Sequence, residues 1–570
     1  MRQKKFLMSL LAILSLSAGL CLGACSSETD PEGDPQTDAD ASVTPGQDDA
    51  SEPGTGPVGE VPLPEGGLRV SVIDELTRRP VLGATVVASV GGVEHALTAQ
   101  DDERYLAIVD SDAAATVSVF HADYHYVTVA DVSARDLVIA VRRLPTARRG
   151  GLKGNMANVW PETPEDTITI GIVGLAVQGN LLDFEPALFL GDARDTNFSL
   201  PSWLDPLVAQ FAPGSETTFT FPGPGSVLIG DKTDYSVFGL PSPCGNEALE
   251  REGACGKQAA FSAFVSIGSI SDPIVGQLLN NETSAFITSV LGSLSGETQL
   301  DLASMLPQLL PMLPTLFSVL NYDYATNREL TFGDRSHELA DKNWAPSLKF
   351  DQSRKVTLPA PPVLMGNEPA DLVGALALAD FGDQGLIPLG VGASQSSNLT
   401  FDMTVTSGRE DLNSAGRKVL AIALDSDLAG AITDTEMDIN FSAIVESFDT
   451  LAEEGTTLTG SFLGAPTGSS FDAATRKISS LPSVEGASLY RAMLTGTDRR
   501  WSIYFGGEST AVTLPAVPAG FADVVSAEAA YTMIALRLGE SVTFESLFAD
   551  DAANADRLND LMNAFSITVH

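Results

Sequence analysis

Residues 68–73 read Leu-Arg-Val-Ser-Val-Ile, and this stretch decides how the folded part of the chain is interpreted. Its large apolar side chains recur at every second position, a period typical of a strand that packs one face on a core. Valine-rich runs follow, separated by turn signals, as far as Leu137–Val141. We therefore predict a compact β unit over residues 67–143.

The turn into the second strand of this unit carries a family resemblance. It reads Pro80-Val81-Leu82-Gly83-Ala84-Thr85-Val86 and is followed by the segment from Thr98 to Tyr105 and by the closing strand at 137–141. This succession resembles the carboxypeptidase regulatory-like domain, a transthyretin-like β-sandwich, and covers about 80 of the 570 residues. We assign this domain to residues 63–145.

The resemblance implies structural roles for particular residues. Gly83 and Ala84 would allow close approach of the chain as it enters the second strand, and Tyr105 would plug one end of the sandwich. The family usually has a glycine just before this aromatic segment, where Glu103 and Arg104 stand here. In its relatives the module is an accessory beside enzymes, transporters and surface proteins, so the resemblance predicts architecture rather than an activity.

The first 24 residues have the pattern of an export signal. Three basic residues within the first five precede an uncharged apolar run from Phe6 to Gly23, as in a secretory signal peptide. The run ends in Leu22-Gly23-Ala24-Cys25, which resembles the lipobox of bacterial lipoproteins. That resemblance implies cleavage after residue 24, a diacylglycerol thioether on Cys25 and acylation of the new amino terminus, for example with palmitate. The alternatives are an ordinary secretory signal with an incidental cysteine and a retained membrane anchor.

Residues 25–62 are expected to form a disordered acidic tether. Ser26 to Glu60 contains ten acids and no Lys or Arg, together with repeated Pro, Gly, Ser and Thr. Such a composition cannot bury enough apolar surface to offset chain entropy. A coil of about 35 residues spans roughly 30–35 Å, so the tether would hold the folded part off the lipid. By resemblance to sorting in two-membrane bacteria, Ser26 rather than Asp after the cysteine permits export to the outer membrane.

Cysteine usage agrees with an oxidising compartment. The lipobox resemblance implies that Cys21 is removed with the signal and that Cys25 carries lipid, which leaves Cys244 and Cys255. The residues between these two are typical of a surface loop, and we predict a disulfide that closes it. A zinc site would need further Cys or His nearby, and the sequence has none there.

The remaining chain is again rich in strand-forming sequence. We assign a β-rich domain with a helical insertion to residues 150–350 and one or more β-rich domains to residues 351–570. Three segments resemble one another, and because proline cannot donate to a β-ladder, each should be a strand stopped by a proline-rich turn. The predicted fold class is mainly β, with several β-sandwich units in series. The three segments are Thr220–Pro224, Thr357–Pro362 and Thr513–Pro518.

The segment at 273–320 breaks the β pattern. It is long, apolar and favourable for helices, and Pro307, Pro311 and Pro314 interrupt it. A membrane-spanning helix with three prolines so close together would lose too many backbone hydrogen bonds. We predict short core helices here; the alternative is a mobile apolar flap or groove for a hydrophobic ligand or partner.

The sequence offers few candidates for catalysis or metal binding. His121 and His125, with Asp123 between them, could hold a surface metal ion, but their β-patterned surroundings favour a strand-and-turn role. His337 has an acid and a serine within three positions, yet residues so close in sequence do not form a catalytic triad. No nucleophile elbow, H-E-x-x-H helix or phosphate-binding glycine loop is present. We assign no catalytic residue, no metal ligand and no cofactor.

The net charge of −41 limits the partners. Nucleic-acid affinity comes mostly from Lys and Arg that neutralise phosphates, so a nucleic-acid partner is excluded. Most of the acidic residues are interpreted as a solvated face. The sequence leaves the oligomeric state open.

Two functional hypotheses follow. The first is a non-enzymatic, lipid-anchored cell-envelope protein of the outer membrane, whose β-sandwich modules act as a binding or structural surface component. The membrane would be its partner through Cys25, with an envelope protein or a glycan as a second partner. The alternative is an extracytoplasmic hydrolase or carbohydrate-active protein with an accessory module, for which four tryptophans are the candidate sugar-stacking groups. They are Trp160, Trp203, Trp344 and Trp501.

Overall fold

The computed structural model describes most of the chain outside its first 61 residues. The described ranges are 62–75, 78–109, 111–144, 149–156, 167–177, 181–183, 193–199, 218–224, 227–229, 233–241, 257–269, 318–329, 340–365, 368–370, 372–406, 415–424, 439–496, 499–525, 529–549 and 558–569. Several predicted features lie outside them: the signal peptide and tether, Cys25, Cys244, Cys255, Trp160, Trp203 and His337.

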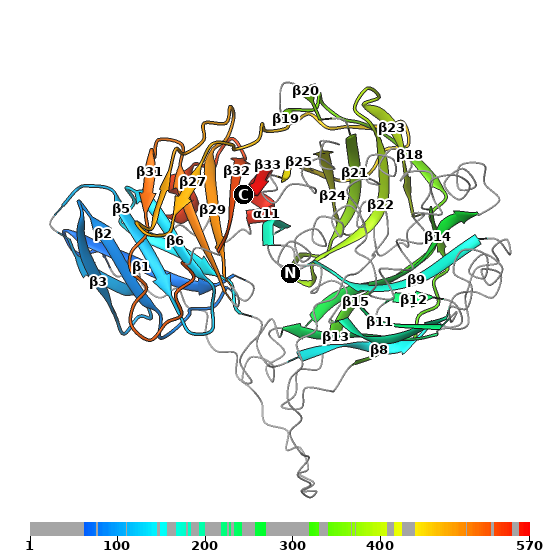
Figure 1. Cartoon of the computed structure of the whole chain (residues 1–570), viewed down its shortest axis with the longest axis horizontal. Coiled ribbons are helices and arrows are strands. Elements are labelled where there is room, and N and C mark those ends of the chain that lie inside the picture. Colours follow the sequence, from blue (N-terminus) through cyan, green and yellow to red (C-terminus); the bar gives the residue numbers. More distant parts are fainter. Residues whose placement is uncertain are drawn as a thin grey trace, which may run out of the picture.

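Residues 62–144 form a sandwich of two sheets, which we call the N-terminal sandwich (blue in Figure 1). One sheet has the order β3-β2-β5-β6 and the other β4-β1-β7, and the end of β3 joins them because it pairs with β4. Leu68, Val70 and Val72 are at most 1% exposed, which confirms the predicted core-facing alternation. The strands are β1 Gly67–Asp74, β2 Thr85–Val90, β3 Val93–Ala99, β4 Tyr105–Ile108, β5 Ala115–Phe120, β6 Tyr126–Val132 and β7 Asp136–Val141.

The segment before β4 explains two features of the sequence. Glu103 has a φ of 64°, in the left-handed region that glycine adopts at lowest cost, and this is the place where the resembled family has a glycine. The buried Tyr105 hydroxyl accepts the backbone N–H of Ala84 at 2.9 Å and donates to the carbonyl of Val81 at 3.3 Å. Tyr105 therefore plugs this end of the sandwich, as predicted.

Between residues 149 and 350, the described strands form three small sheets of order β12-β9-β14-β15-β17, β13-β8-β16 and β10-β11. Leu152, Phe264 and Trp344 belong to the buried core of this region. Its elements are β8 Arg149–Asn155, β9 Thr167–Leu175, the 3-10 helix η1 Leu181–Asp183, β10 Ala193–Ser199, β11 Thr218–Pro224, β12 Val227–Ile229, β13 Asp234–Pro241, β14 Lys257–Ser269, β15 Ser318–Glu329, β16 Ala340–Asp341 and β17 Leu348–Lys349.

From residue 352 onward, the strands pair in the order β26-β18-β23-β22-β21-β24-β25-β33-β32-β29-β30, which we call the C-terminal ladder. Strands β19 and β20 form a separate pair, and β27, β28 and β31 form a small sheet. The strands are β18 Gln352–Thr357, β19 Val363–Met365, β20 Glu368–Pro369, β21 Leu372–Asp380, β22 Leu386–Gln395, β23 Thr400–Val405, β24 Gly416–Leu424, β25 Ile439–Phe448, β26 Thr456–Thr457, β27 Ser470–Asp472, β28 Lys477–Ser479, β29 Leu489–Thr495, β30 Arg500–Gly506, β31 Ala511–Thr513, β32 Ala530–Leu538 and β33 Met562–Val569. The helices are η4 Gly382–Gln384, α10 Phe544–Phe548 and α11 Leu558–Leu561.

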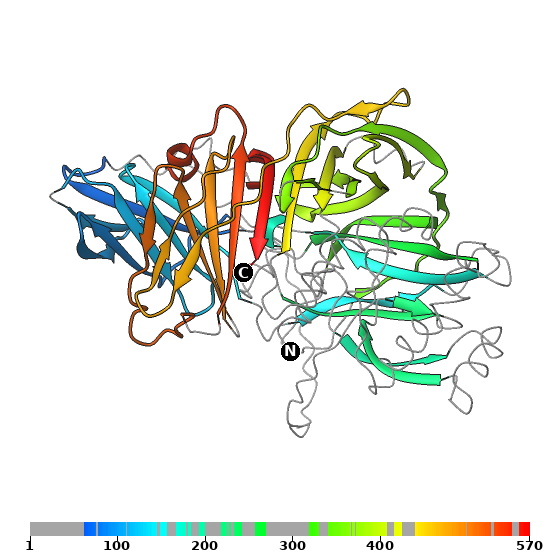
Figure 2. The ribbon, with the colours of Figure 1, turned by 45° about the horizontal axis from the view of Figure 1, so that its top comes forward.

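The C-terminal ladder continues into the N-terminal sandwich, because β30 pairs with β6. Figures 1 and 2 both show the blue strands of the sandwich beside the orange and red strands from the end of the chain. One face of this continuous sheet carries a core that includes Tyr126, Trp501 and Met533. In the ladder the opposite face carries a second core, which includes Leu536 and Phe565.

The mainly β fold is confirmed, and two details of the prediction are corrected. Strand β11 runs through Pro222, which is paired with β10, and ends at Pro224, so the first proline of this segment does not end its strand. In the described part β11 pairs on one side only, where a proline without an N–H is tolerated. The other two segments do follow the ends of β18 and β31.

The helical prediction for 273–320 is wrong at its end, because Ser318 to Leu320 belong to β15, whose ladder with β14 fixes them as extended. The remainder of that segment lies outside the described residues. Within the described ranges, no helix has both the length and the apolar character needed to span a bilayer.

Candidate functional site

Within the described residues, a group of polar and aromatic contacts lies where the N-terminal sandwich meets the end of the chain. We call this contact the joint; it consists of β6, β30, the loop 514–525 and α10. Strands β6 and β30 run parallel, with Trp501 opposite Tyr126 and Phe505 opposite Ala130. Six of the seven β6 residues are buried. A strand covered on both faces needs apolar or β-branched side chains on both, which the sequence of β6 supplies.

Four aromatic rings pack together at the joint. Phe120 from β5 lies edge-on to Tyr126 and to Trp501, with ring centroids 5.0 and 5.3 Å apart. Phe521 from the loop lies 6.3 Å from both Phe120 and Tyr126. Each such ring pair contributes about 0.5–1.5 kcal/mol beyond the area that it buries. The rings thus connect three segments that are distant in sequence.

Buried hydrogen bonds fix the orientation of the tryptophan. The Trp501 indole N–H donates to the Thr128 hydroxyl at 2.9 Å, and that hydroxyl lies 2.7 Å from the hydroxyl of Ser118. A buried indole N–H without a partner would carry a large desolvation penalty. The Thr128 side chain therefore selects how β30 approaches β6.

Arg499 ties the start of β30 to the turn before β6. Its guanidinium donates to the carbonyls of His121 and Ala122 at 2.9 and 2.6 Å, and it lies 4.4 Å from the centroid of the Tyr126 ring. Next to it, the Arg500 N–H donates to Nδ1 of His125 at 2.9 Å. The planar guanidinium can satisfy two carbonyls and a ring face at once.

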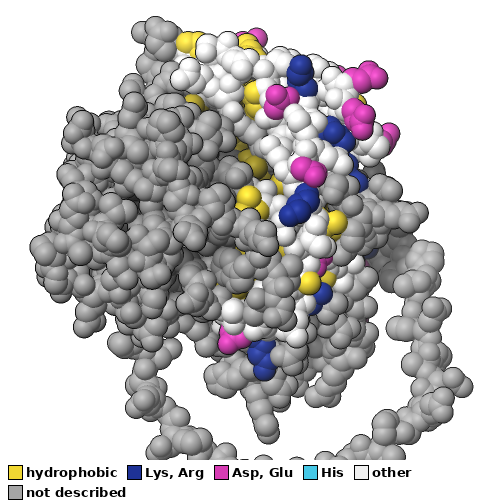
Figure 3. All heavy atoms as spheres, turned by 90° about the vertical axis from the view of Figure 1, so that its right-hand side faces the viewer, with side chains coloured by type: hydrophobic (Ala, Val, Ile, Leu, Met, Phe, Trp, Pro, Cys, Tyr) yellow, Lys and Arg dark blue, Asp and Glu magenta, His cyan; other side chains and the backbone are white. Residues whose placement is uncertain are grey.

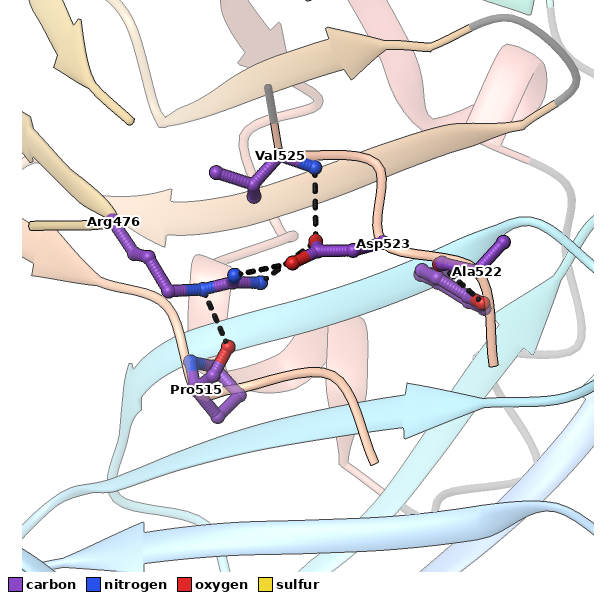
Figure 4. Close-up of polar contacts among 6 residues, drawn as sticks. Arg476, Pro515, Ala522, Asp523 and Val525 are labelled. Atoms are coloured by element: carbon purple, nitrogen blue, oxygen red, sulfur yellow. Dashed lines mark hydrogen bonds and ion pairs between the residues drawn. The ribbon is translucent and has the colours of Figure 1, made fainter. Parts of the chain in front are cut away.

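An ion pair holds the loop 514–525 over the joint (Figure 4). Arg476 donates to both carboxylate oxygens of Asp523 at 2.8 and 3.1 Å and to the carbonyl of Pro515 at 3.0 Å. The Tyr126 hydroxyl donates to the carbonyl of Ala522 at 3.0 Å. Partial burial raises the pKa of Asp523, but the bonds from Arg476 and from the Val525 N–H outweigh it, so the pKa of this carboxyl lies below its usual range.

Helix α10 closes the other side of the joint. Its Phe548 is 7% exposed and belongs to the core of the N-terminal sandwich, beside Tyr504 at 5.5 Å between ring centroids. The carboxylate of Glu545 accepts the backbone N–H groups of Ser133 and Ala134 at 3.0–3.1 Å. Phe548, which lies within the last 30 residues of the chain, thus completes the core of the N-terminal sandwich, to which β1 also contributes.

A second polar cluster lies at the end of β1. The Tyr124 hydroxyl donates to Asp74 Oδ2 at 3.0 Å, and Arg143 contacts both the tyrosine hydroxyl and, at 3.6 Å, the same carboxylate oxygen. Burial, together with the negative charge of Asp74, raises the pKa of Tyr124 well above its usual range. The tyrosine therefore stays protonated and acts as a donor, which makes this cluster a structural clamp.

The histidines take backbone partners. His121 places Nε2 at 3.1 Å from the Leu82 carbonyl oxygen and accepts the Asp123 N–H at Nδ1. Burial lowers the pKa of His121, opposed by Asp123 and reinforced by Arg143 and Arg499. In the part of the chain that the structure describes, no group of His, Cys, Asp and Glu could hold a metal ion. Both histidines lie in the predicted strand-and-turn setting.

The sequence did not reveal the joint. Trp501 was a candidate for sugar stacking, but it is fully buried, and Trp344 is 3% exposed. The available signal was in β6, where Tyr126, Val127 and Val129 give apolar character to both faces and indicate a strand with neighbours on both sides. No local sequence pattern predicts that this second neighbour is β30.

Comparisons with known proteins give no family. No protein-family model matches the chain, and no curated protein matches it. A solved structure of the Bacillus anthracis TIE protein aligns with 69% of this chain at 9% identity and a TM-score of 0.14, and the chain spans about half, 49%, of its length. A Ca²⁺-stabilised adhesin with which an Antarctic bacterium binds ice aligns with 83% of this chain and 95% of its own at 8% identity and a TM-score of 0.10.

Proposed function

We propose that this protein is a lipid-anchored component of the cell envelope whose joined β-sheets act as a binding or structural surface outside the membrane. The observation that carries the proposal is the sequence Leu22-Gly23-Ala24-Cys25, with its resemblance to a lipobox. Acyl chains contribute about 0.8 kcal/mol per buried CH₂, so two or three chains attach a protein stably where one would be marginal. Ser26 after the cysteine supports the outer membrane as the destination.

The way in which the chain enters the folded part supports a tethered surface component. The Gly67 N–H donates to the Pro64 carbonyl at 2.8 Å, and a Cβ at Gly67 would lie 2.8 Å from the same oxygen. The chain therefore makes a tight turn where the acidic segment ends and β1 begins. A fixed turn at this place gives the tether a defined point of attachment.

The module architecture supports a role without catalysis. The resemblance of residues 63–145 to an accessory domain implies no catalytic residues there. At the joint, the side chains with perturbed pKa values, such as Tyr126 and Asp523, are engaged in packing and loop attachment. We also propose the Cys244–Cys255 disulfide, which intact-mass measurement with and without reductant would test as a difference of two hydrogens.

The experiment that tests the anchor compares two cysteine variants in expressing cells. In Cys25→Ala the protein should move from the membrane fraction to the soluble one or remain uncleaved, because the acyl acceptor is lost. Cys21→Ala is the matched control and should behave as the wild type. Globomycin, which blocks lipoprotein signal cleavage, should cause accumulation of the precursor, and mass spectrometry should find acyl chains on Cys25. An unmodified Cys25 in the mature protein would refute the anchoring.

A further inference from the structure

Strand β3 leaves one side of the N-terminal sandwich open. Residues 93–97 pair with β2 on one side, and on the other side only Thr98 and Ala99 pair with β4. Figure 1 shows β3 at the outer margin of the sandwich, on the side away from the joint. In the described part of the chain, residues 93–97 thus have no neighbouring strand on that side. We call these residues the open edge.

The hairpin determines which backbone groups of the open edge point outward. The turn between β2 and β3 has positive φ at Gly91 (58°) and Gly92 (82°), as in a type I′ turn, so the residues that flank it form a hydrogen-bonded pair. Hydrogen-bonded and non-hydrogen-bonded pairs alternate along an antiparallel ladder. The N–H and C=O groups of Glu94 and Ala96 therefore point away from β2, and among the described residues these groups have no partner.

The open edge lacks the usual protection of a sheet edge. Natural edges are blunted by lysine, proline, a bulge, shortness or a covering element. Strand β3 has seven residues, Val-Glu-His-Ala-Leu-Thr-Ala, without lysine or proline, and its register with β2 is regular. A long and regular edge with free backbone groups is a template for an added strand.

Two other edges of these sheets are protected. At the far end of the continuous sheet, β26 has only two residues, and β18 beside it carries Arg354 and Lys355. Figure 3 shows the side of the molecule where β18 lies, and there Lys and Arg side chains stand among Asp and Glu side chains. In the second sheet of the sandwich, Leu137 of β7 pairs with Ala549, directly after α10. The open edge is longer than β26, and no described element covers it.

Exposed apolar side chains accompany the open edge. Val93 at the start of β3 is 58% exposed, and Ile108 at the end of β4 is 54% exposed. They are two of the four large apolar side chains that are exposed in the described part of the chain. Both lie beyond the short pairing of β3 with β4, where the two strands belong to different sheets. A strand added beside β3 would cover Val93 with its own side chains, as cross-strand neighbours do.

Acidic side chains flank the open edge. Glu94 lies within it, Asp101 and Glu103 follow in the turn before β4, and all three are exposed. In the described structure none of these three carboxylates forms an ion pair, although Arg104 adjoins Glu103 in sequence. Complementary charges across an interface favour one partner and suppress others. The open edge therefore selects an extended partner with basic side chains.

The same charges disfavour two occupants from this protein itself. A second copy would bring its own Glu94 and its own acidic turn to the open edge, and each chain has a net charge of −41. The segment from Ser26 to Glu60 contains ten acids and no Lys or Arg, so it would be repelled as well. A basic segment of a different protein fits the charges better.

We propose that the open edge binds an extended segment of another envelope protein, which adds a strand to the sheet and carries Lys or Arg on both sides of a short uncharged stretch. Backbone hydrogen bonds to Glu94 and Ala96 provide affinity in this mode of recognition, and contacts of alternate side chains provide specificity. The proposal refines the proposed function and rests on it for the location of the partner.

The test measures binding of a fluorescent synthetic peptide to the full mature protein. The lysine peptide alternates valine and threonine and has two lysines at each end, and the glutamate peptide has glutamates in place of the lysines. We expect the lysine peptide to bind and to slow hydrogen exchange at the amides of Glu94 and Ala96. The glutamate peptide should bind about 5-fold more weakly or worse at low salt, because exposed charge pairs are screened only as salt rises.

Two variants separate backbone pairing from charge. Ala96→Pro keeps the charge and removes an N–H that β2 does not use, so the fold should persist, since edge strands tolerate proline. It should weaken the lysine peptide by about 10-fold, as expected for a lost hydrogen bond. Glu94→Gln should weaken it by about 2- to 5-fold at low salt. The matched control is Glu454→Gln, an exposed acid beside β26, which should bind as the wild type does.

Four results would overturn the proposal: a wild type that does not bind the lysine peptide, equal binding of the two peptides, unchanged binding by a folded Ala96→Pro, or a dimer of the wild type that Ala96→Pro abolishes. The last result, measured by sedimentation, would assign the open edge to a second copy. If Ala96→Pro does not fold, Glu94→Gln is compared with Glu454→Gln alongside the exchange measurement. Failure of the anchor would appear as a soluble, unlipidated protein that still binds the lysine peptide, so the two failures are distinguishable.

Discussion

The N-terminal sandwich and the joint are both built by strand pairing, but they bring together different parts of the chain. In the sandwich, β2 pairs with β3 and β5 with β6, which are neighbours in sequence. At the joint, β30 of the ladder pairs with β6 of the sandwich, and the bond from Arg500 to His125 joins residues 375 positions apart. Local sequence patterns therefore predict strands and their buried faces. Which strand edges pair at the joint depends on side-chain packing between segments that are distant in sequence.

The two kinds of contact also use different side chains. The core of the sandwich is mostly aliphatic, with many valines such as Val70, Val117 and Val129. The joint uses aromatic rings and arginines, which combine large buried area with directional hydrogen bonds. Valine packing suffices between strands that are close in sequence. Between segments that are distant in sequence, directional groups specify the contact.

The largest expected effect comes from truncating Phe548, the side chain of α10 that packs into the core of the N-terminal sandwich. Phe548→Ala should lower the free energy of unfolding by about 3–5 kcal/mol, because it leaves a cavity in the core of the sandwich. Chemical denaturation measures this loss. Phe548→Leu should restore most of it. Equal stability of the alanine variant and the wild type would show that α10 does not support the sandwich.

A smaller effect is expected inside the sandwich. Tyr105→Phe leaves the buried N–H of Ala84 without its partner and should cost about 1–3 kcal/mol. The same denaturation measurement applies, and Tyr105→Leu, which also removes the ring, should cost more. If Tyr105→Phe were as stable as the wild type, the ring of Tyr105 alone would account for its contribution to stability.

The ion pair over the joint should contribute less. The Asp523 side chain is 47% exposed, so Asp523→Asn should cost at most about 1 kcal/mol. Because the pKa of Asp523 is lowered from its ordinary value of 3.8, its contribution is fully present above that pH and is lost only as the pH falls through the lower folded value. Melting temperatures of wild type and variant should therefore differ by a constant amount between pH 7 and pH 5 and converge in stronger acid. Convergence already at pH 5 would contradict the lowered pKa.

The smallest expected effect concerns Glu103, which stands where the resembled family usually has a glycine. Glu103→Gly should stabilise the protein by about 0.5–1 kcal/mol, because relief of the left-handed strain exceeds the added entropy of the unfolded chain. Glu94→Gly, in the extended strand β3, is the control and should destabilise. A destabilised Glu103 variant would show that its side chain offsets the strain.

Much of the fold followed from local sequence, and the site did not. The alternation around Val70 and Val72 predicted β1 and its core face, whereas the role of Tyr105 at one end of the sandwich was implied by the family resemblance. Proline was a weaker guide, because Pro222 lies within a strand that pairs on one side in the described part. Trp501 was predicted as a candidate for sugar stacking, but it is buried, its partner Thr128 lies in another region, and no periodicity encodes that contact.

The central claim is that the joint makes the N-terminal sandwich and the C-terminal ladder one cooperative unit, and hydrogen exchange on Met533→Ala tests it most directly. Met533 is fully buried in β32, outside the sandwich. We predict that exchange accelerates by the same factor in β32 and in β2 and β5, which are central to the sandwich. Faster exchange in β32 with unchanged rates in β2 and β5 would contradict the claim.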